Sequence, residues 1–468
     1  MALNVSDLQP RATQRVQTRW RRILTSIPVP ESVPVIERLR AVEPRSMATM
    51  PPILWDEAQG FLVRDRYGNQ WIDLSSGIMV ANAGHSHPRI CKAIRDAVDQ
   101  NLLVSYVFAT EARLKLLEKL AALAPIDDAK AILFSSGTEA NECAIGLMRR
   151  HGRNIHEDKV GILSFTGGYH GRSLACAMAS GVESPSDWIK RDRLYHYQIP
   201  FPYCPNCPWG RKKYEACGED CFEKCLESLA KRGIRPGQIA GIIGEAMPGW
   251  ATWHLPVDFA QAMAAWAKRH DILVCFDEVQ SGCGRSGRWF AFEHFGVTPD
   301  LITMGKGLTS SLAVSAVLGS RSLLDLADPG EMSSTHGGNP VSAAAALANL
   351  KVIEDEKLLE AAQQTGEVML AKLRRLQQDY PDRIHCVQGK GLFISMHLVN
   401  PSNGERDLAL AEAVTLEAVR RGVMMFLTGS GFLKIAPPLC IEQEAALEAV
   451  DVIGESLQAA VKDSDDPS

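Results

Sequence analysis

Short apolar segments recur along the chain, with amphipathic segments of helical length between them. Mostly apolar runs of four to six residues occupy Ala131–Phe134, Gly161–Phe165, Ile239–Gly244, Ile272–Cys275 and Leu301–Met304. Such runs predict strands that are buried on both faces, as in parallel sheets. The segments 88–101 and 111–124 have the period of amphipathic helices, and a further helix is expected from the end of the first run to about Arg150. Buried strands that alternate with helices predict an α/β fold.

Nearer the N-terminus the pattern changes, because apolar and polar residues alternate there with a period of two. The segments Ile53–Trp55 and Phe61–Leu74 predict a hairpin whose turn contains Tyr67-Gly68-Asn69. The preceding segment, Pro28–Pro52, is interrupted by prolines and is expected to wrap the surface.

Two charged residues follow two of the predicted buried strands. Asp277 comes shortly after Cys275, and Lys306 lies 29 residues further on, between two glycines. In open α/β sheets, ligands bind at the carboxyl ends of strands. A carboxylate and a glycine-flanked lysine in these positions fit a site for pyridoxal phosphate (PLP). Lys306 would form a Schiff base with the cofactor aldehyde, and Asp277 would keep the pyridine nitrogen protonated, which makes the ring an electron sink.

The residues around this pair form a longer motif. Asp277–Gly287 reads Asp-Glu-Val-Gln-Ser-Gly-Cys-Gly-Arg-Ser-Gly, and Pro299-Asp300 and Gly305-Lys306-Gly307 follow it. This motif resembles the signature of class III aminotransferases, which are PLP enzymes of fold type I. The resemblance extends from about Pro51 to Glu442. It implies a mostly parallel seven-stranded sheet in a large domain and a smaller α+β domain.

The resemblance also implies a division of the chain. We expect an N-terminal arm over 1–50 and the first part of the small domain over 51–85. A large PLP-binding domain is expected over 86–340, with a cysteine-rich insertion over 200–230. The remaining segment, 341–468, is expected to contain a linking helix and the C-terminal part of the small domain.

A turn between a predicted strand and a predicted helix carries small hydroxylated residues and a glycine. It reads Ser135-Ser136-Gly137-Thr138-Glu139-Ala140-Asn141. The N–H groups at a helix start and the helix dipole favour an anion there. Ser-x-x-Glu is equally the pattern of an ordinary capping box. The resemblance implies that the turn is the phosphate cup, with Ser136, Gly137 and Thr138 as cofactor-binding residues.

Further cofactor contacts are implied by the resemblance. Tyr169 is expected to stack on the pyridine ring, with His170 beside it and Val279 on the opposite face. Glu245 follows the predicted strand Ile239–Gly244 and is expected to help position Gln280, which would bond the ring hydroxyl. Together with Lys306 and Asp277, Glu245 is assigned to the catalytic group.

Two departures from the family pattern concern the substrate. Relatives place the residues up to Met79 against the substrate, and this chain keeps that segment. Where some relatives have a glutamate that pairs with a movable arginine, this chain has Trp250. Where an arginine normally binds the substrate carboxylate, it has Lys434, a point charge in place of a two-pronged donor. A carboxylate held more loosely, a different acidic group and a plain surface lysine all remain open for Lys434.

The segment Ser334–Pro340 matches the Thr-x-Gly-Gly-Asn-Pro turn of the family. In relatives the threonine hydroxyl reaches the cofactor phosphate of the neighbouring subunit. The resemblance therefore implies a homodimer with shared active sites, to which Thr335 contributes.

The implied activity is transfer of an amino group from a small amine or amino acid to a 2-oxo acid. Lys306 would remove a proton from the substrate carbon and return it to the cofactor. The same groups also suit a lyase that eliminates ammonia or phosphate, an amino-acid racemase or a decarboxylase. The replacements at Trp250 and Lys434 strengthen these alternatives, whereas a non-catalytic PLP-binding module is not expected to keep both Lys306 and Asp277.

Five cysteines lie within 22 residues: Cys204, Cys207, Cys217, Cys221 and Cys225. Thiolates at Cys-x-x-Cys spacing suit zinc or an iron–sulfur cluster. The second group does not have a standard zinc spacing, so reduced thiols or an occasional disulfide are the favoured interpretation and no metal ligand is assigned. His85 and His87 form a further potential metal pair, but they match a structural Gly-His-x-His-Pro turn of the family.

Composition and charge fit a soluble enzyme. The chain has 468 residues, 46% of them apolar, and a net charge of −5, which argues against general nucleic-acid binding. No apolar run reaches the length of a membrane span. The 12 scattered cysteines suggest free thiols and a cytoplasmic location. The arginine-rich start of the chain is expected to be a docking helix or a loose basic arm, in preference to a transit segment.

Overall fold

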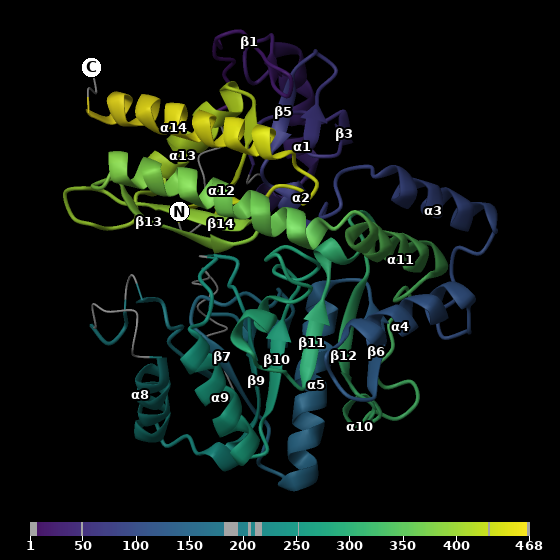
Figure 1. The fold of residues 1–468 in the computed structure, drawn as a ribbon. Coiled ribbons are helices and arrows are strands. Elements are labelled where there is room, and N and C mark those ends of the chain that lie inside the picture. Colours follow the sequence, from purple (N-terminus) through teal and green to yellow (C-terminus); the bar gives the residue numbers. More distant parts are fainter. Residues whose placement is uncertain are drawn as a thin grey trace. The chain divides into compact units, whose positions relative to one another are not determined.

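The computed structural model describes residues 7–47, 50–181, 195–204, 207–210, 218–250, 252–428 and 431–465. The chain divides into two compact units, one formed by Met1–His87 with Lys357–Ser468 and the other by Pro88–Glu356 (Figure 1). Within the described ranges, no helix has both the length and the apolar character that crossing a membrane requires.

The unit Pro88–Glu356 is built on a sheet that has seven strands in the described part of the chain, in the order β6-β12-β11-β10-β9-β7-β8. Within the series β11-β10-β9-β7-β8, adjacent strands are parallel to one another. Strand β12 is antiparallel to both β11 and β6. The strands are β6 (Ala129–Phe134), β7 (Gly161–Phe165), β8 (His196–Ile199), β9 (Ile239–Gly244), β10 (Leu273–Asp277), β11 (Leu301–Met304) and β12 (Ser315–Ser320). The five apolar runs are therefore confirmed as strands, and the mostly parallel sheet of fold type I is confirmed with them.

Helices accompany this sheet in the same unit. They are α3 (Pro88–Asp99), α4 (Glu111–Leu123), α5 (Gly137–Ile155), α6 (Leu174–Ala179), α8 (Gly218–Lys231), α9 (Val257–Arg269), α10 (Arg321–Leu324) and α11 (Pro340–Asp355). Helix α5 packs on β9, β11 and β12, and α8 packs beside α9, as Figure 1 also shows. The expected helix that was to end near Arg150 thus continues to Ile155, and its apolar face contributes Ala144, Leu147 and Met148 to the core.

The topology brings three of the predicted catalytic residues to one edge of the sheet. Strands β9, β10 and β11 are neighbours and run parallel, so their carboxyl ends lie side by side. Glu245 follows β9, Asp277 is the last residue of β10, and Lys306 comes two residues after β11. Asp277 is paired in register with Thr303 of β11. This edge is where an open parallel sheet binds its ligand.

The unit of Met1–His87 and Lys357–Ser468 has two sheets in its described residues. One follows the path β1-β2-β5-β4-β3, with β15 paired to β5, and the other has the order β13-β14-β17-β16. The strands are β1 (Val16–Gln17), β2 (Arg22–Ile23), β3 (Glu57–Gln59), β4 (Leu62–Arg64), β5 (Gln70–Asp73), β13 (Ile384–Lys390), β14 (Phe393–Leu398), β15 (Val423–Met424), β16 (Phe426–Leu427) and β17 (Phe432–Ile435). The helices are α1 (Val33–Val42), α2 (Ser76–Met79), α12 (Leu358–Asp379), α13 (Leu408–Arg420) and α14 (Gln443–Asp465). Antiparallel pairing of β4 with β5 confirms the predicted hairpin.

The N-terminal segment differs from the expected docking helix or loose arm. Strand β1 pairs with β2, and β2 joins β5. Ile23 of β2 is fully buried in a cluster with Val63 and Trp71. The expectation was wrong because this segment pairs with β5 and buries Ile23 in the core of the unit. The proline-punctuated stretch after it contains α1, which accommodates Pro34 because this residue stands at the second position of the helix.

The short element α2 is a left-handed turn. Ser76, Gly77, Ile78 and Met79 have φ values of 52°, 57°, 65° and 62°. A left-handed backbone costs a non-glycine residue about 1–2 kcal/mol, so surrounding contacts must hold the turn. Asp73 supplies several of these contacts: its carboxylate accepts from the Ser75 backbone N–H at 2.7 Å and from the Gly77 N–H at 3.3 Å.

Replacing Gly77 by alanine should destabilise this unit by about 1–2 kcal/mol through the backbone alone. A Cβ at this position would meet nothing closer than His85 Cε1, at 3.7 Å, so no clash adds to the cost. The free energy of urea unfolding measures the effect. The control is Gly454→Ala in α14, where the added Cβ would lie at an ordinary 3.4 Å from Leu376 Cδ1. This helical position should gain about 0.5–1 kcal/mol, and an unchanged free energy in Gly77→Ala would contradict the left-handed turn.

Candidate active site

Asp277 is a buried carboxylate with three hydrogen-bond donors. Its Oδ2 accepts from His170 Nδ1 at 2.8 Å and from Asn141 Nδ2 at 2.7 Å, while its Oδ1 accepts from the Val279 backbone N–H at 3.0 Å. Since a carboxylate only accepts hydrogen bonds, Nδ1 of His170 carries the proton. Burial lowers the pKa of His170, but the adjacent Asp277 charge outweighs burial and leaves this pKa raised. The three donors compensate the burial of the Asp277 carboxylate.

Glu245 ties together the loops that follow three strands. Its Oε2 accepts from the Tyr169 backbone N–H at 2.9 Å, and its Oε1 accepts from Gly249 N–H at 3.0 Å and from Gln280 Nε2 at 2.9 Å. Burial, followed by the charge of Asp277, raises the pKa of Glu245 to about 6. The contact with Gln280 that the sequence led us to expect is therefore present.

Lys306 follows Gly305 at the end of β11 and is partly buried. Burial lowers the pKa of its amine, and the charges of Asp277 and Glu245 oppose this effect without cancelling it. The residue has a φ of 41°, a left-handed conformation of the kind that functional sites retain under strain. A Cβ at position 305 would lie 3.3 Å from Val279 Cγ1, so the glycine lets β11 approach the loop after β10.

The start of α5 is a complete capping box. Ser136 Oγ accepts from the Glu139 N–H at 3.3 Å, and Glu139 Oε2 accepts from the Ser136 N–H at 2.8 Å and from its hydroxyl at 2.9 Å. The capping interpretation of Ser-x-x-Glu is thus confirmed. Gly137 and Thr138 occupy the first helical positions, where backbone N–H groups have no partner within the helix. An anion at this turn would meet these two N–H groups.

Tyr169 and Val279 lie on loops that follow β7 and β10. Tyr169 is 38% exposed, which is unusual for a large ring beside buried residues, whereas His170 next to it is 2% exposed. A Cβ on Gly137 would be 2.8 Å from Val279 Cγ1. The valine therefore packs directly on the first residue of α5, and only glycine fits there.

These groups fit PLP. Asp277 offers an ionised carboxylate for the pyridine nitrogen, Lys306 offers an amine, and the first turn of α5 offers N–H groups for the phosphate. A further sign is Nε2 of His170, which is buried and has no hydrogen-bond partner among the described residues. Buried polar atoms in folded proteins are nearly always paired, and a functional site is one explanation for an exception.

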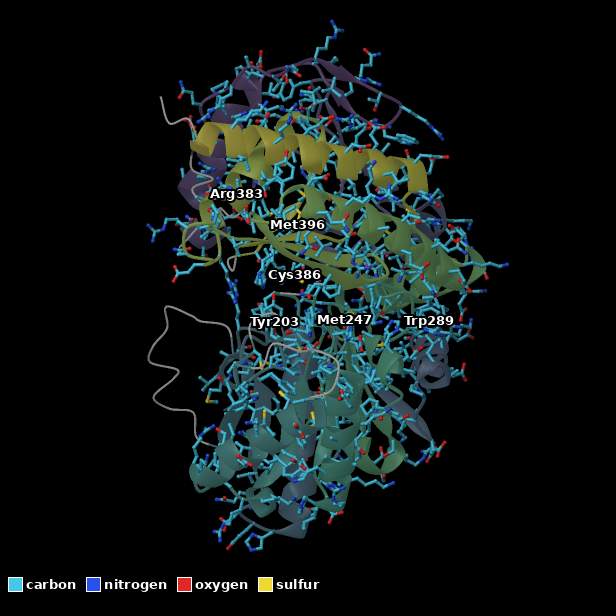
Figure 2. All side chains as sticks on the ribbon, turned by 60° about the vertical axis from the view of Figure 1, so that its left-hand side comes forward. Tyr203, Met247, Trp289, Arg383, Cys386 and Met396 are labelled. Carbon is cyan, nitrogen blue, oxygen red and sulfur yellow. The ribbon has the colours of Figure 1, made fainter. Side chains whose placement is uncertain are left out.

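Trp250, a predicted substrate contact, belongs to an aromatic cluster. Its ring centroid lies 5.3 Å from that of Tyr203 and 6.3 Å from that of Phe201, both in edge-to-face geometry. The indole also packs against Gly167, where a Cβ would be 2.7 Å from its Nε1. Figure 2 labels Tyr203 and Met247, which follow β8 and β9 in the same unit. Trp250, which stands where some relatives have a glutamate, is therefore part of an aromatic cluster.

Lys434 and Met79 belong to the other unit. Lys434 of β17 is 4% exposed and lies across from Ser395 of β14. Its Nζ is 5.2 Å from the ring centroid of Phe426 and 5.9 Å from that of Phe393. It is thus not a plain surface lysine. Figure 2 marks the same sheet by Cys386 of β13 and Met396 of β14, and Met79 of the left-handed turn is 2% exposed.

Thr335 is exposed, in a turn that is tied to the start of α5. The neighbouring Ser334 donates from its hydroxyl to Glu139 Oε1 at 3.0 Å. The same glutamate caps α5, so one carboxylate links this turn to the expected phosphate cup.

The cysteine-rich segment is only partly described, and Cys217 lies outside the described residues. Cys204, Cys207 and Cys221 line one shallow pocket, and Cys225 is buried one helical turn beyond Cys221. Across the described ranges, no group of three or more His, Cys, Asp or Glu residues has an arrangement that could hold a metal ion. His85 donates from Nε2 to Asp73 Oδ2 at 2.7 Å, a contact that supports its structural role.

The sequence did not reveal Asn141 and Thr303 as members of this site. Asn141 was visible only as part of the turn motif, and Thr303 only as part of an apolar run. The signal was an asparagine in a helix interior, where this residue is unfavourable unless its amide finds partners. Both side chains contact each other, and Asn141 contacts Asp277.

Comparison with known sequences gives one family over most of the chain. The family described as "Aminotransferase class-III" matches residues 43–457. The leucine/methionine racemase of Thermococcus litoralis is 32% identical over 433 residues, which cover 92% of this chain and 95% of the racemase. The 4-aminobutyrate aminotransferase of Mycobacterium leprae is 31% identical over 445 residues, which cover 93% of this chain and 98% of that enzyme.

Comparison with solved structures agrees. An amine transaminase from an uncultivated Pseudomonas species, solved in its PLP-bound form, superposes with a TM-score of 0.79. The two chains share 25% sequence identity, and the match covers 90% of this chain and 96% of the transaminase.

Proposed function

The chain belongs to the class-III aminotransferase family, and on this premise we propose that Lys306, Asp277 and Glu245 carry its reaction. The enzyme depends on PLP and transfers an amino group between an amine or amino acid and a 2-oxo acid. One observation above all supports the choice of residues, namely that the three follow three adjacent parallel strands. The roles below extend from that arrangement.

Lys306 holds the cofactor and moves the proton. When bound, PLP supplies a carbonyl group for the substrate amine and a ring that withdraws electrons from the substrate carbon. Because burial lowers the pKa of Lys306, its Nζ is available as a neutral amine. It would accept a proton from the substrate carbon and, in amino transfer, return it to the cofactor carbon that carried the aldehyde.

The other groups would hold and orient the cofactor. The Asp277 carboxylate keeps a proton on the pyridine nitrogen. Glu245 fixes the Gln280 amide, which donates to the ring hydroxyl. Tyr169, with His170 beside it, and Val279 would contact the ring of the cofactor.

The phosphate is held at the start of α5. Gly137 and Thr138 would donate their backbone N–H groups. The Ser136 hydroxyl, engaged in the capping box, keeps these donors in place. Thr335 donates from the second subunit.

A homodimer is supported by an exposed apolar stretch between α3 and α4. Its members include Leu103, Val104 and Val107, and Phe108 is 76% exposed. A contiguous apolar surface of this kind is usually covered by a partner. Tyr106 Oη lies 2.9 Å from Ser333 Oγ, which links the stretch to the turn of Thr335. A second copy is therefore the proposed occupant, and a light-scattering mass of one chain would contradict it.

The proposed location is the cytoplasm. The described cysteines are free, and a reducing compartment keeps thiols in that state. Cell fractionation that recovered the protein outside the cytoplasm would contradict this assignment.

Lys434 occupies the sequence position at which relatives bind the substrate carboxylate, so the proposed donor is a small amine or amino acid with an acidic group. Trp250 replaces the family glutamate, so the donor side of the site is apolar and does not carry that switch. Relatives named for 4-aminobutyrate and 5-aminovalerate supply the first donors to test.

A racemase is the second candidate, because two relatives named as racemases match over most of the chain. Racemisation uses the same lysine and carboxylate but returns the proton to the opposite face of the substrate carbon. It consumes no 2-oxo acid. Elimination by a lyase likewise consumes none, but releases ammonia.

The test follows the absorbance of the bound cofactor while candidate donors are added: 4-aminobutyrate, 5-aminovalerate, leucine and methionine. Conversion to pyridoxamine phosphate, and recovery on addition of a 2-oxo acid, is the result expected of an aminotransferase. Loss of optical activity without a 2-oxo acid would establish a racemase. Release of ammonia and a carbonyl product without a 2-oxo acid would establish a lyase.

A further inference from the structure

Asn141 is a polar residue in the interior of α5 and is 1% exposed. Asparagine is unfavourable at such a position because its amide competes with the helix for hydrogen bonds. A buried amide is expected to have partners. Here the partners come from three separate segments that meet at the site.

The amide makes three hydrogen bonds. Nδ2 donates to Asp277 Oδ2 at 2.7 Å and to the His170 backbone carbonyl at 2.8 Å. Oδ1 accepts from the Thr303 hydroxyl at 2.6 Å. Thr303 is fully buried on β11 and pairs in register with Asp277 on β10.

The chemistry of these partners fixes which way the amide points. A carboxylate oxygen and a backbone carbonyl only accept, so the NH₂ group must face Asp277 and His170. The Thr303 hydroxyl is then the donor that holds the amide oxygen. If that hydroxyl is lost, the opposite end of the amide loses its anchor.

This arrangement determines what surrounds Asp277. His170 and Asn141 both donate to Oδ2, and they approach it from the loop after β7 and from α5. The carboxylate is thereby held in one rotamer. Three N–H groups point at the two oxygens of Asp277, and a carboxylate can accept from all of them.

We propose that Asn141, oriented by Thr303, is a positioning residue that holds the ionised Asp277 carboxylate against the pyridine nitrogen of PLP. The proposal rests on the function assigned to Asp277 above. Asn141 touches neither substrate nor cofactor in this account and acts through Asp277. A second effect follows from the bond to the His170 carbonyl, which fixes the loop that carries Tyr169.

Three variants separate the parts of this network. Asn141→Leu keeps the approximate volume and removes the donor to Asp277. Thr303→Val keeps the shape and removes only the hydroxyl, whereas Thr303→Ser keeps the hydroxyl and restores the anchor. Cys143→Ala, on the same helix and buried, is the matched control because it changes packing without a contact to Asp277.

The holoenzyme is reconstituted with PLP labelled with ¹⁵N in its ring, and the nitrogen chemical shift reports protonation. In Asn141→Leu the signal should move towards the unprotonated value, and kcat should fall about 10- to 100-fold with KM changed little, as for one lost bond to a charged group. The dissociation constant of PLP, measured by titrating the cofactor-free protein, should rise. Thr303→Val should show the same changes to a smaller extent, and Thr303→Ser and Cys143→Ala should resemble the wild type.

A wild-type nitrogen shift and kcat in a folded Asn141→Leu protein would overturn the proposal. If Asn141→Leu does not fold, the two Thr303 variants test the proposal instead. Identical nitrogen shifts and kcat values in Thr303→Val and Thr303→Ser would overturn it. The function assigned to Asp277 fails separately, if Asp277→Asn retains full activity. An inactive Asp277→Asn together with wild-type behaviour of all Asn141 and Thr303 variants would remove only the positioning role.

Discussion

Lys306→Ala is expected to lower kcat for amino transfer by about 10³- to 10⁴-fold. The variant loses the amine that holds the cofactor and the group that moves the proton between substrate and cofactor. Loss of the proton-transfer group acts on the chemical step, and loss of the covalent attachment weakens cofactor binding. Binding of PLP should persist in weakened form, because Asp277 and the start of α5 remain.

The fold should tolerate this change. Lys306 already has a left-handed φ of 41°, and alanine meets a comparable backbone cost there, so the substitution adds little strain. Removing the amine also removes a buried group whose pKa is lowered by burial, so desolvation of a charge is relieved. The melting temperature of the cofactor-free protein should therefore stay close to that of the wild type.

The measurement is single-turnover conversion of a donor, followed by cofactor absorbance, beside a thermal melt. Lys268→Ala is the control, since Lys268 is an exposed lysine of α9 in the same unit. An intact melt with kcat within tenfold of the wild type would show that Lys306 is not the catalytic lysine. The control variant should retain wild-type kcat and spectrum.

The edge of the sheet that carries the candidate site could be predicted from sequence. Strands buried on both faces must be continuously apolar, so a charged residue directly after such a run marks the strand end. Asp277 and Glu245 were found by this reasoning, and Lys306 by the glycines around it. The hairpin of β4 and β5 was equally accessible, because alternation and a turn sequence both indicated it.

Contacts between distant segments could not be predicted in this way. Asn141 and Thr303 are 162 residues apart in the chain, and the local sequence of neither segment predicts a contact with the other. Each has a local explanation, since asparagine is common in turns and threonine in strands. Only the folded structure shows that the two buried side chains bond to each other and that Asn141 bonds to Asp277.

Local sequence was also misleading where tertiary contacts override it. Strands β1 and β2 have two residues each, which is shorter than any period that alternation could reveal. In the turn of α2, Ile78 has a φ of 65°, which a β-branched residue disfavours. Asp73 and its partners hold that turn, so the backbone geometry of the turn is determined by surrounding contacts and not by its local sequence.

Asp277→Asn is expected to lower kcat by about 10³-fold, in the range seen when a preorganised charge is removed from an active site. Asparagine has the shape of aspartate but is neutral, so it cannot keep a proton on the pyridine nitrogen. It also conflicts with its neighbours. Its NH₂ would face the donors His170 and Asn141 in one orientation, and the Val279 N–H in the other.

The control for this change is Asp271→Asn. Asp271 is exposed in the same unit and has a φ of 51°, a conformation that asparagine adopts readily. It removes the same charge far from any hydrogen bond to Asp277, so kcat should be unchanged. A comparable loss in both variants would mean that net charge, and not the site, is responsible.

A cofactor analogue separates the charge of Asp277 from its shape. Asp277→Ala leaves room for a methyl group on the pyridine nitrogen, and N-methylated PLP carries a permanent positive charge there. If the task of the carboxylate is to keep that nitrogen charged, the analogue should restore part of the lost kcat in Asp277→Ala. It should restore nothing in Lys306→Ala, whose defect is the missing amine. Failure to restore Asp277→Ala, with the analogue shown to bind, would mean that Asp277 acts by placing the ring and not by charging it.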